Sequence, residues 1–152
     1  MSRMTSHRNT HPKVTAWVFL AVWMSLIMSL SSVPGSSIPS AGESPIGKVI
    51  DYVLRQGGHL LLHVVLGLLA WRATRRTWGQ RTALVVALLL VLPFAVLDEL
   101  YQAFTPGRDV NAEDLAYNTV GVLIPFALMW GKALLPFQVR ARWSALMLLT
   151  KE

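Results

Sequence analysis

The sequence predicts an all-α membrane protein with four transmembrane helices, on three observations. Of its 152 residues, 53% are hydrophobic and only 14% are charged, and the mean hydropathy is +0.46. Soluble domains carry about 25% charged residues, so this deficit favours lipid as the solvent. Apolar runs of about one membrane thickness alternate with short polar connections. Most Lys and Arg residues fall in every second polar segment.

The first helix is predicted over residues 14–33, which are apolar and uncharged. A run of this length can cross a bilayer. The preceding residues 1–13 are polar and basic, a pattern that is also typical of a signal peptide. The apolar run is longer than the core of a signal peptide, and residues 31–34 form a poor cleavage site. We therefore interpret the segment as an uncleaved membrane helix.

The second helix is harder to delimit. Residues 34–47 are rich in Ser, Pro and Gly, which predicts a loop. Residues 48–56 predict a short amphipathic helix at the membrane surface, and the Gly57-Gly58 pair interrupts the pattern. The apolar run 59–71 is short for a span, but a helix that starts near Asp51 would be long enough to cross.

The third helix is predicted from the apolar run 82–97, which follows an arginine-rich connection over residues 72–81. We expect this helix to continue to about Phe104, with Pro93 as a kink that neighbouring groups can tolerate. Residues 105–107 (Thr-Pro-Gly) then predict a turn.

The fourth helix is predicted to start at Val110 or Asn111, and Asn111 is the better N-cap residue type. Its apolar part covers residues 115–135. The two acidic residues in its first turn suit the positive end of the helix dipole. Residues 138–152 predict a basic, partly amphipathic tail that lies on the inner membrane surface.

The distribution of Lys and Arg predicts the orientation. The N-terminal segment, the second connection and the C-terminal tail contain three, four and three of these residues, whereas the other two connections contain two and one. Both termini are therefore expected in the cytoplasm, in a multi-pass protein of the inner (plasma) membrane. The predicted organisation is a cytoplasmic segment 1–13, a four-helix membrane domain 14–137 and a cytoplasmic tail 138–152.

Composition also excludes several functions. The chain has no Cys, which excludes disulfides, thiolate metal sites and a cysteine nucleophile. It has no basic stripe with interleaved aromatic residues, so we expect no nucleic-acid partner. Membrane lipids are the expected environment, and the oligomeric state stays open.

A polar stretch over residues 98–118 holds five of the eight acidic residues and lies between two apolar runs. Charged groups at the edge of a bilayer are costly and usually functional. Helical spacing and a rise of about 1.5 Å per residue bring polar residues of the second, third and fourth helices to a similar depth near the extracytoplasmic side. Gly67 and Gly121 would allow the helix backbones to approach closely. The predicted ligand-binding residues are His59, Asp98, Glu99, Gln102, Arg108, Asp114 and Asn118.

The histidines and carboxylates of this cluster each have two interpretations. His59 and His63 have the spacing of a metal-binding pair, but buried histidines that bind a carboxylate or a carbonyl are more common. We expect no metal and no cofactor. Asp98 and Glu99 are candidate catalytic residues as a general acid and base. Because adjacent helical residues point about 100° apart, both cannot face one substrate atom equally.

The other polar residues also have structural interpretations. Arg108 could clamp an anionic ligand with two parallel hydrogen bonds, or form a salt bridge to Asp109, Glu113 or Asp98. The simplest role for Gln102 and Asn118 is hydrogen bonding between helices.

The spacing of these residues resembles that of the VanZ-like family of small integral membrane proteins. That family has a histidine that opens one helix, then Asp-Glu-x-x-Gln, a Pro-Gly-Arg turn and Asp-x-x-x-Asn-x-x-Gly. The resemblance covers residues 54–135. The matching residues are His59, Asp98, Glu99, Gln102, Pro106, Gly107, Arg108, Asp114, Asn118 and Gly121. The chain departs from the family where Asp-Lys is usual, at Arg55-Gln56, and where an aromatic residue is usual, at His63.

The resemblance implies a multi-helix membrane protein, and the founding member is associated with low-level resistance to the glycopeptide teicoplanin. Our preferred hypothesis is an outward-facing polar pocket that binds a cell-envelope ligand, such as a lipid head group or a glycan precursor. One alternative is a membrane-embedded hydrolase or transferase that acts on lipid-linked substrates through Asp98 and Glu99. A second alternative is a small transporter or an assembly subunit.

Overall fold

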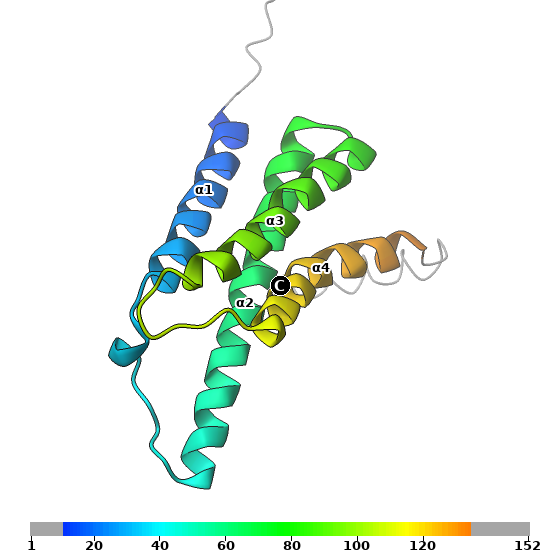
Figure 1. The fold of residues 1–152 in the computed structure, drawn as a ribbon. Helices are drawn as coiled ribbons and strands as arrows, with labels where there is room; N and C mark the ends of the chain where they lie inside the picture. The colour runs from blue at the N-terminus through cyan, green and yellow to red at the C-terminus, as the bar shows by residue number, and fades with distance from the viewer. Residues whose placement is uncertain (1–10, 135–152) are drawn as a thin grey trace, which may run out of the picture.

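A computed structural model describes residues 11–134, which form four α-helices and one short 3-10 helix (Figure 1). The α-helices are α1 (His11–Ser31), α2 (Pro45–Thr77), α3 (Gln80–Gln102) and α4 (Ala112–Leu134). The 3-10 helix η1 (Gly35–Ser37) lies between α1 and α2. Residues 1–10 of the predicted N-terminal segment and the whole predicted tail, 138–152, lie outside the described residues.

Helix α2 is the longest element and packs against each of the other three α-helices (Figure 1). The first half of α1 meets the end of α2, where Trp17 Nε1 donates to Thr77 Oγ1 at 3.0 Å. At the opposite end, the end of α1 meets the α3–α4 connection, where Thr105 Oγ1 donates to Ser31 O at 2.9 Å. Helices α1, α2 and α3 therefore run in alternating directions.

Small side chains allow the helices to pack closely. The buried positions of α2 and α3 include Ala70, Ala73, Ala83, Ala87 and Ala95. Small residues are typical of helix contacts in membranes, because lipid provides no hydrophobic force between helices and close packing has to hold them together.

The α2–α4 crossing depends on two glycines. A Cβ atom on Gly67 would lie 2.7 Å from Val122 O, and one on Gly121 would lie 2.6 Å from Leu60 O. Since real Cβ atoms do not come so close to a carbonyl oxygen, a side chain at either position would force α2 and α4 apart. The expectation that Gly67 and Gly121 permit a close backbone approach is confirmed.

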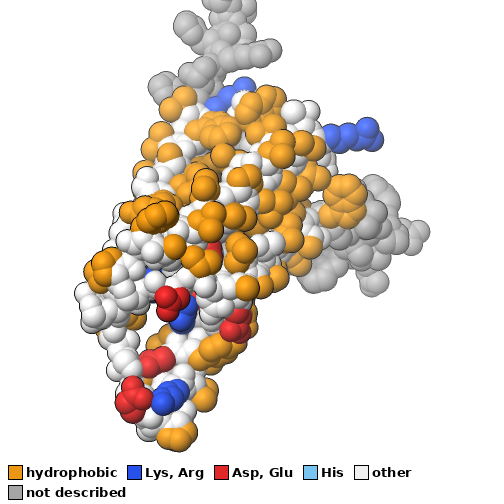
Figure 2. Space-filling view, viewed as in Figure 1, with side chains coloured by type: hydrophobic (Ala, Val, Ile, Leu, Met, Phe, Trp, Pro, Cys, Tyr) orange, Lys and Arg blue, Asp and Glu red, His pale blue; other side chains and the backbone are white. Residues whose placement is uncertain are grey.

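The outer surface is apolar in the manner of a membrane protein. Hydrophobic side chains cover most of the face in Figure 2; acidic and basic side chains lie in its lower part, and Lys and Arg side chains lie at its upper end. Within the described residues, α1, α2 and α3 are long and apolar enough to cross a membrane. Exposed hydrophobic residues on these helices include Phe19, Val22, Leu61, Val85 and Leu89. The four predicted helices are confirmed, whereas crossing by α4 and the orientation of the termini stay predictions.

Helix α2 corrects two predictions. The surface helix over residues 48–56 is not separate, and the Gly57-Gly58 pair does not interrupt it, because α2 is continuous from Pro45 to Thr77. A break inside an apolar environment would leave backbone groups without partners. That loss exceeds the cost of about 1 kcal/mol for a helical glycine relative to alanine. The loop predicted over residues 34–47 ends earlier, because α2 already begins at Pro45. Ser44 caps the helix, and its side chain accepts from Gly47 N at 3.0 Å.

The arginine-rich connection predicted over residues 72–81 is mostly helical, because α2 continues to Thr77 and α3 begins at Gln80. The remaining boundaries lie near the predicted ones. Helix α1 begins three residues before the predicted position 14, α3 ends at Gln102, and Pro93 lies inside α3. Asn111 precedes α4 and its Oδ1 accepts from Glu113 N at 2.9 Å, which is the geometry of an N-cap.

Candidate functional site

The polar end of the helix bundle contains a cavity of about 640 Å3. It lies between the end of α1, the first half of α2, the end of α3 and the α3–α4 connection. Apolar side chains, among them Ile27, Leu30, Leu54 and Leu62, form part of its wall. The polar lining residues are Ser31, Ser40, Asp51, Arg55, His59, His63, Asp98, Arg108 and Asp109.

Asp98 joins three helices at the wall of this cavity. The residue is 1% exposed. Oδ1 accepts a hydrogen bond from Ser31 Oγ of α1 at 2.5 Å, and Oδ2 lies 3.7 Å from His63 Nε2 of α2. His63 Nδ1 lies 3.0 Å from the carbonyl oxygen of His59. A carbonyl oxygen can only accept, so Nδ1 carries a hydrogen and Nε2 faces the carboxylate.

A second histidine–aspartate pair lies one helical turn earlier on α2. His59 Nδ1 lies 2.9 Å from Asn118 Oδ1, and His59 Nε2 lies 3.7 Å from Asp114 Oδ2. His59 and His63 therefore use the same arrangement, in which Nδ1 binds an oxygen and Nε2 faces a carboxylate. The predicted hydrogen bond of Asn118 between helices is confirmed, because it connects α2 with α4.

Asp114 is the most heavily bound carboxylate of the site. It is fully buried. Arg55 forms a salt bridge to Oδ2, with Nε at 3.1 Å and Nη2 closer still, and Gln56 Nε2 donates to Oδ1 at 2.9 Å. Charged hydrogen bonds of this kind are strong when both guanidinium nitrogens take part. The first turn of α4 is thereby fixed to the middle of α2.

Glu99 and Gln102 lie on α3 and do not line the cavity. Glu99 is 1% exposed, and its Oε1 accepts from Asn111 N at 2.6 Å, so it holds the start of α4. Gln102 is equally buried, but neither of its amide atoms has a hydrogen-bond partner in the described part of the chain. The prediction that Gln102 forms a hydrogen bond between helices is therefore wrong.

Arg108 has no salt bridge to a carboxylate within residues 11–134. The predicted alternative of a structural salt bridge to Asp109, Glu113 or Asp98 is therefore wrong. Glu113 is bound by the Tyr52 hydroxyl, and Asp98 is bound by Ser31. The Arg108 side chain is half-buried, and its Nε is buried without a hydrogen-bond partner there.

The connection that carries Arg108 is fixed to the end of α1. Thr105 Oγ1 donates to Ser31 O at 2.9 Å, and Gly35 N donates to Pro106 O at 2.9 Å. Gly107 has φ of 71°, which favours glycine. A Cβ atom on Gly35 would lie 1.9 Å from Gly107 O, so the two segments approach each other through their backbones.

The structure divides the predicted ligand-binding residues into two groups. His59, Asp98 and Arg108 line the cavity, and the remaining four, Glu99, Gln102, Asp114 and Asn118, do not. Asp114 and Asn118 contact the ring nitrogens of His59, and Glu99 accepts from Asn111 N at the end of the α3–α4 connection. The three lining residues are therefore placed to contact a ligand. Of the other four, all but Gln102 are placed to position the lining residues or the connection that carries Arg108. Binding itself stays a prediction for all seven.

Sequence analysis did not assign Ser31, Arg55 or Gln56 to the site. Arg55 and Gln56 precede His59 by four and three residues, so helical spacing places them on its face and could have identified them. No sequence pattern distinguishes Ser31 as a site residue, because it is one of two adjacent serines at the end of an apolar run. The departure at Arg55-Gln56 is therefore part of the site, since both residues bind Asp114.

The part of the chain that the structure describes contains no group of three or more His, Asp or Glu residues that could hold a metal ion. His59 and His63 each place one ring nitrogen on a protein oxygen and the other near a carboxylate. The arrangement can bind charged and hydroxylated groups through Arg108, the histidines and Asp98.

Comparison with known proteins gives one match. The profile of the VanZ/LLP1 family matches residues 16–135, which cover all of α2, α3 and α4 and all but the first five residues of α1. A search of curated proteins and a search of solved structures found no match. The family match covers most of the chain and includes every polar residue of the site described above. The chain is therefore a membrane protein of the VanZ/LLP1 family.

Proposed function

We propose that the cavity binds an anionic, envelope-derived amphiphile, a lipid head group or a glycan precursor, from the outer side of the membrane. The observation that carries the proposal is Arg108, whose Nε is buried at the cavity without a partner in the described residues. A buried guanidinium donor without an acceptor is costly. A phosphate or carboxylate would accept from it in a bidentate geometry.

The other charged groups of the cavity support an anionic ligand. Asp51 accepts from Ser40 Oγ at 2.7 Å and from Ala41 N at 2.8 Å. Asp98 accepts from Ser31, and Arg55 is bound to Asp114. Arg108 and the exposed Asp109 are the charged lining residues, within 11–134, that have no such partner. Of these two, Arg108 has the buried polar atom.

The wall composition supports an amphiphile over a small polar solute. Ile27, Leu30, Leu54 and Leu62 lie beside Arg108 and the histidines in one cavity. Small-molecule sites combine apolar walls with a few polar groups that fix orientation. In the proposed complex, Arg108 binds the anionic group, Asp98 accepts from a hydroxyl of the ligand, and the leucines contact its chain.

A thermal-shift screen of the detergent-purified protein tests this proposal. The probes are lipid-linked glycan precursors, polyprenyl phosphates and soluble glycerophosphate head groups. A ligand at 100 times its Kd stabilises the folded state by about 2.7 kcal/mol, which raises Tm by roughly 5–10 °C for a chain of this size. The Arg108→Ala variant should lose the shift, and Arg72→Ala, which removes the same charge at the opposite end of α2, should keep it.

Two outcomes would refute the proposal. One is a shift of equal size in Arg108→Ala and in the parent chain. The other is failure of both Arg108→Ala and Asp98→Asn to insert or accumulate, which would make these residues structural. Expression in a teicoplanin-sensitive bacterium is a separate experiment. A higher resistance that Arg108→Ala abolishes would extend the proposed function to the glycopeptide phenotype.

One observation favours an enzyme as the second candidate. His63 and Asp98 are both 1% exposed, face each other at 3.7 Å and line the cavity. Such a pair can take and return a proton in hydrolysis or transfer on a lipid-linked substrate. Asp98 lines the cavity and Glu99 does not. If Asp98 is the reacting carboxylate, Asp98→Asn should abolish turnover and retain ligand binding. Glu99→Gln should retain turnover if it inserts normally. The opposite result would exclude Asp98 as the reacting carboxylate.

A further inference from the structure

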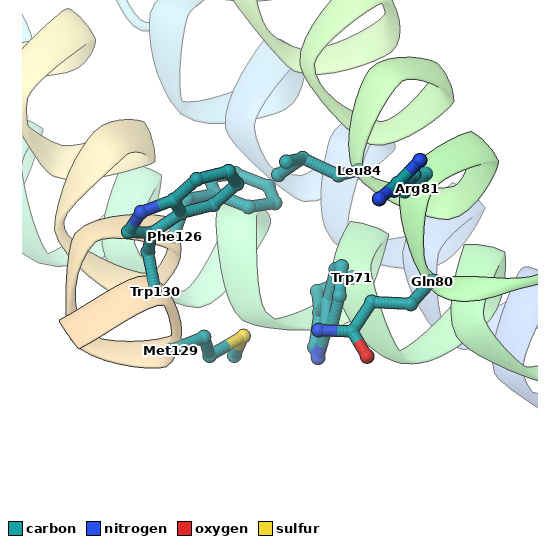
Figure 3. Close-up of a pocket in the computed structure, with 7 residues that line it drawn as sticks. All are labelled: Trp71, Gln80, Arg81, Leu84, Phe126, Met129 and Trp130. Atoms are coloured by element: carbon teal, nitrogen blue, oxygen red, sulfur yellow. The ribbon is translucent and has the colours of Figure 1, made fainter. Parts of the chain in front are cut away.

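A second cavity lies at the other end of the helix bundle, away from the polar site. Its volume is about 350 Å3, and it is bounded by the end of α2, the start of α3 and the end of α4. In Figure 3, Phe126, Met129 and Trp130 of α4 lie on one side of it and Trp71, Gln80, Arg81 and Leu84 on the other. We call this space the aromatic groove.

The walls of the aromatic groove are preformed. The rings of Trp71 and Phe126 pack edge to face with centroids 6.2 Å apart. The guanidinium of Arg75 lies over Trp71, 5.5 Å from its centroid. Phe126 is buried, whereas Trp130 is 59% exposed and borders the groove at its surface. Tryptophans in such positions are typical of the zone where lipid chains meet head groups.

Charge determines what this groove can hold. The chain has no Asp or Glu between Asp51 and Asp98, and none between Asp114 and Glu152. No carboxylate therefore belongs to the lining, in which Arg81 is the charged residue. Arg75 does not line the groove, but its guanidinium lies over the ring of Trp71, which does. Basic pockets between membrane helices bind anionic lipid head groups.

The chain's own tail is the less favourable occupant. Residues 138–152 carry Arg140, Arg142 and Lys151 against a single acid, Glu152. A tail of the same charge as Arg81 and Arg75 would be repelled from the groove, whereas an anionic lipid would be attracted.

We propose that the aromatic groove binds one anionic phospholipid. Its phosphate contacts Arg81 and Gln80, and one acyl chain lies along Trp71, Leu84 and Phe126. The site is separate from the Arg108 cavity and does not depend on the function proposed for that cavity.

Native mass spectrometry of the full-length protein tests this site. The protein is extracted from vesicles of phosphatidylcholine that contain phosphatidylglycerol, and the retained lipids are counted. The parent chain should retain one phosphatidylglycerol in preference to phosphatidylcholine. Arg81→Ala loses the charged hydrogen bonds to the phosphate and should reduce retention by about tenfold or more. Arg72→Ala, whose side chain does not line the groove, loses only the general attraction of one surface charge and should reduce retention by no more than about fivefold.

A photo-crosslinking residue at position 84 gives an independent measurement. With p-benzoylphenylalanine in place of Leu84, irradiation in the same vesicles should add the mass of one phosphatidylglycerol to the chain. Equal losses in Arg81→Ala and Arg72→Ala would show a diffuse basic surface and overturn the proposal. A crosslink from position 84 to residues 138–152 would also overturn it, because the tail would then occupy the groove.

Discussion

The substitution Gly121→Ala tests whether the α2–α4 crossing holds the site together. The added Cβ would lie 2.6 Å from Leu60 O and 2.9 Å from His63 Cβ. The backbone carbonyl of α2 cannot move independently of its helix, so α2 and α4 have to separate. Asn118 lies one turn before Gly121 on α4, and its 2.9 Å contact with His59 would lengthen.

The expected loss of stability follows from two terms. Overpacking of a helix contact costs about 1–3 kcal/mol, and loss of the His59–Asn118 hydrogen bond costs about 1 kcal/mol. Alanine recovers about 1 kcal/mol through its higher helix propensity. The net loss of about 1–3 kcal/mol corresponds to a fall in Tm of roughly 3–10 °C for a chain of this length.

The assay is thermal unfolding of the purified variants in one detergent. Gly57→Ala is the matched control, because a Cβ at that position has nothing within 4 Å and α2 continues through it. Its Tm should be equal to or higher than that of the parent. A Tm of Gly121→Ala at or above the parent, or an equal fall in both variants, would refute close packing at this crossing.

Three further substitutions test the rest of the site. Ser31→Ala leaves the buried Asp98 without its hydroxyl donor and should lower the free energy of unfolding by about 1–3 kcal/mol, measured by thermal unfolding; no change would exclude the contact. Asp114→Asn removes the charge that binds Arg55. Because Arg55 is partly exposed, Asp114→Asn should lower the free energy of unfolding by about 1–2 kcal/mol. Arg55→Gln should lower it by a similar amount, and an unchanged Arg55→Gln variant would contradict the pairing. Gly35→Ala places a Cβ 1.9 Å from Gly107 O; it should abolish the ligand-induced thermal shift through displacement of Arg108 while membrane insertion stays normal, and an intact shift would contradict that role.

The helices could be predicted from the sequence because apolar length and turn residues determine them. Residues 105–107 and Asn111 gave the α3–α4 connection correctly, since Pro, Gly and Asn have strong local preferences. The continuity of α2 could not be predicted in the same way. Glycine pairs interrupt helices in water, and only the surrounding apolar environment and the contacts of Arg55 and Gln56 with α4 make the unbroken helix favourable.

The convergence of the site was predictable, but its pairing was not. Helical spacing placed His59, Asp98 and Asn118 near one depth, and the structure brings them to adjacent elements. Which carboxylate each cation contacts depends on the rotation of each helix about its axis. In this structure the rotation pairs Arg55 with Asp114, and Arg108 lies at the cavity with no partner for its Nε in the described residues. No local pattern in the sequence encodes the rotation.

A single measurement tests whether the polar cavity faces the outside of the cell. The chain has no Cys, so one can be introduced at Ile38, which lines the cavity, or at Gly79, which is exposed at the opposite end with nothing within 4 Å of an added Cβ. Intact bacteria that express each variant are treated with a membrane-impermeant maleimide. We expect Ile38→Cys to react in intact cells and Gly79→Cys to react only after lysis. Reaction of Gly79→Cys alone in intact cells would place the cavity in the cytoplasm and contradict the proposed function.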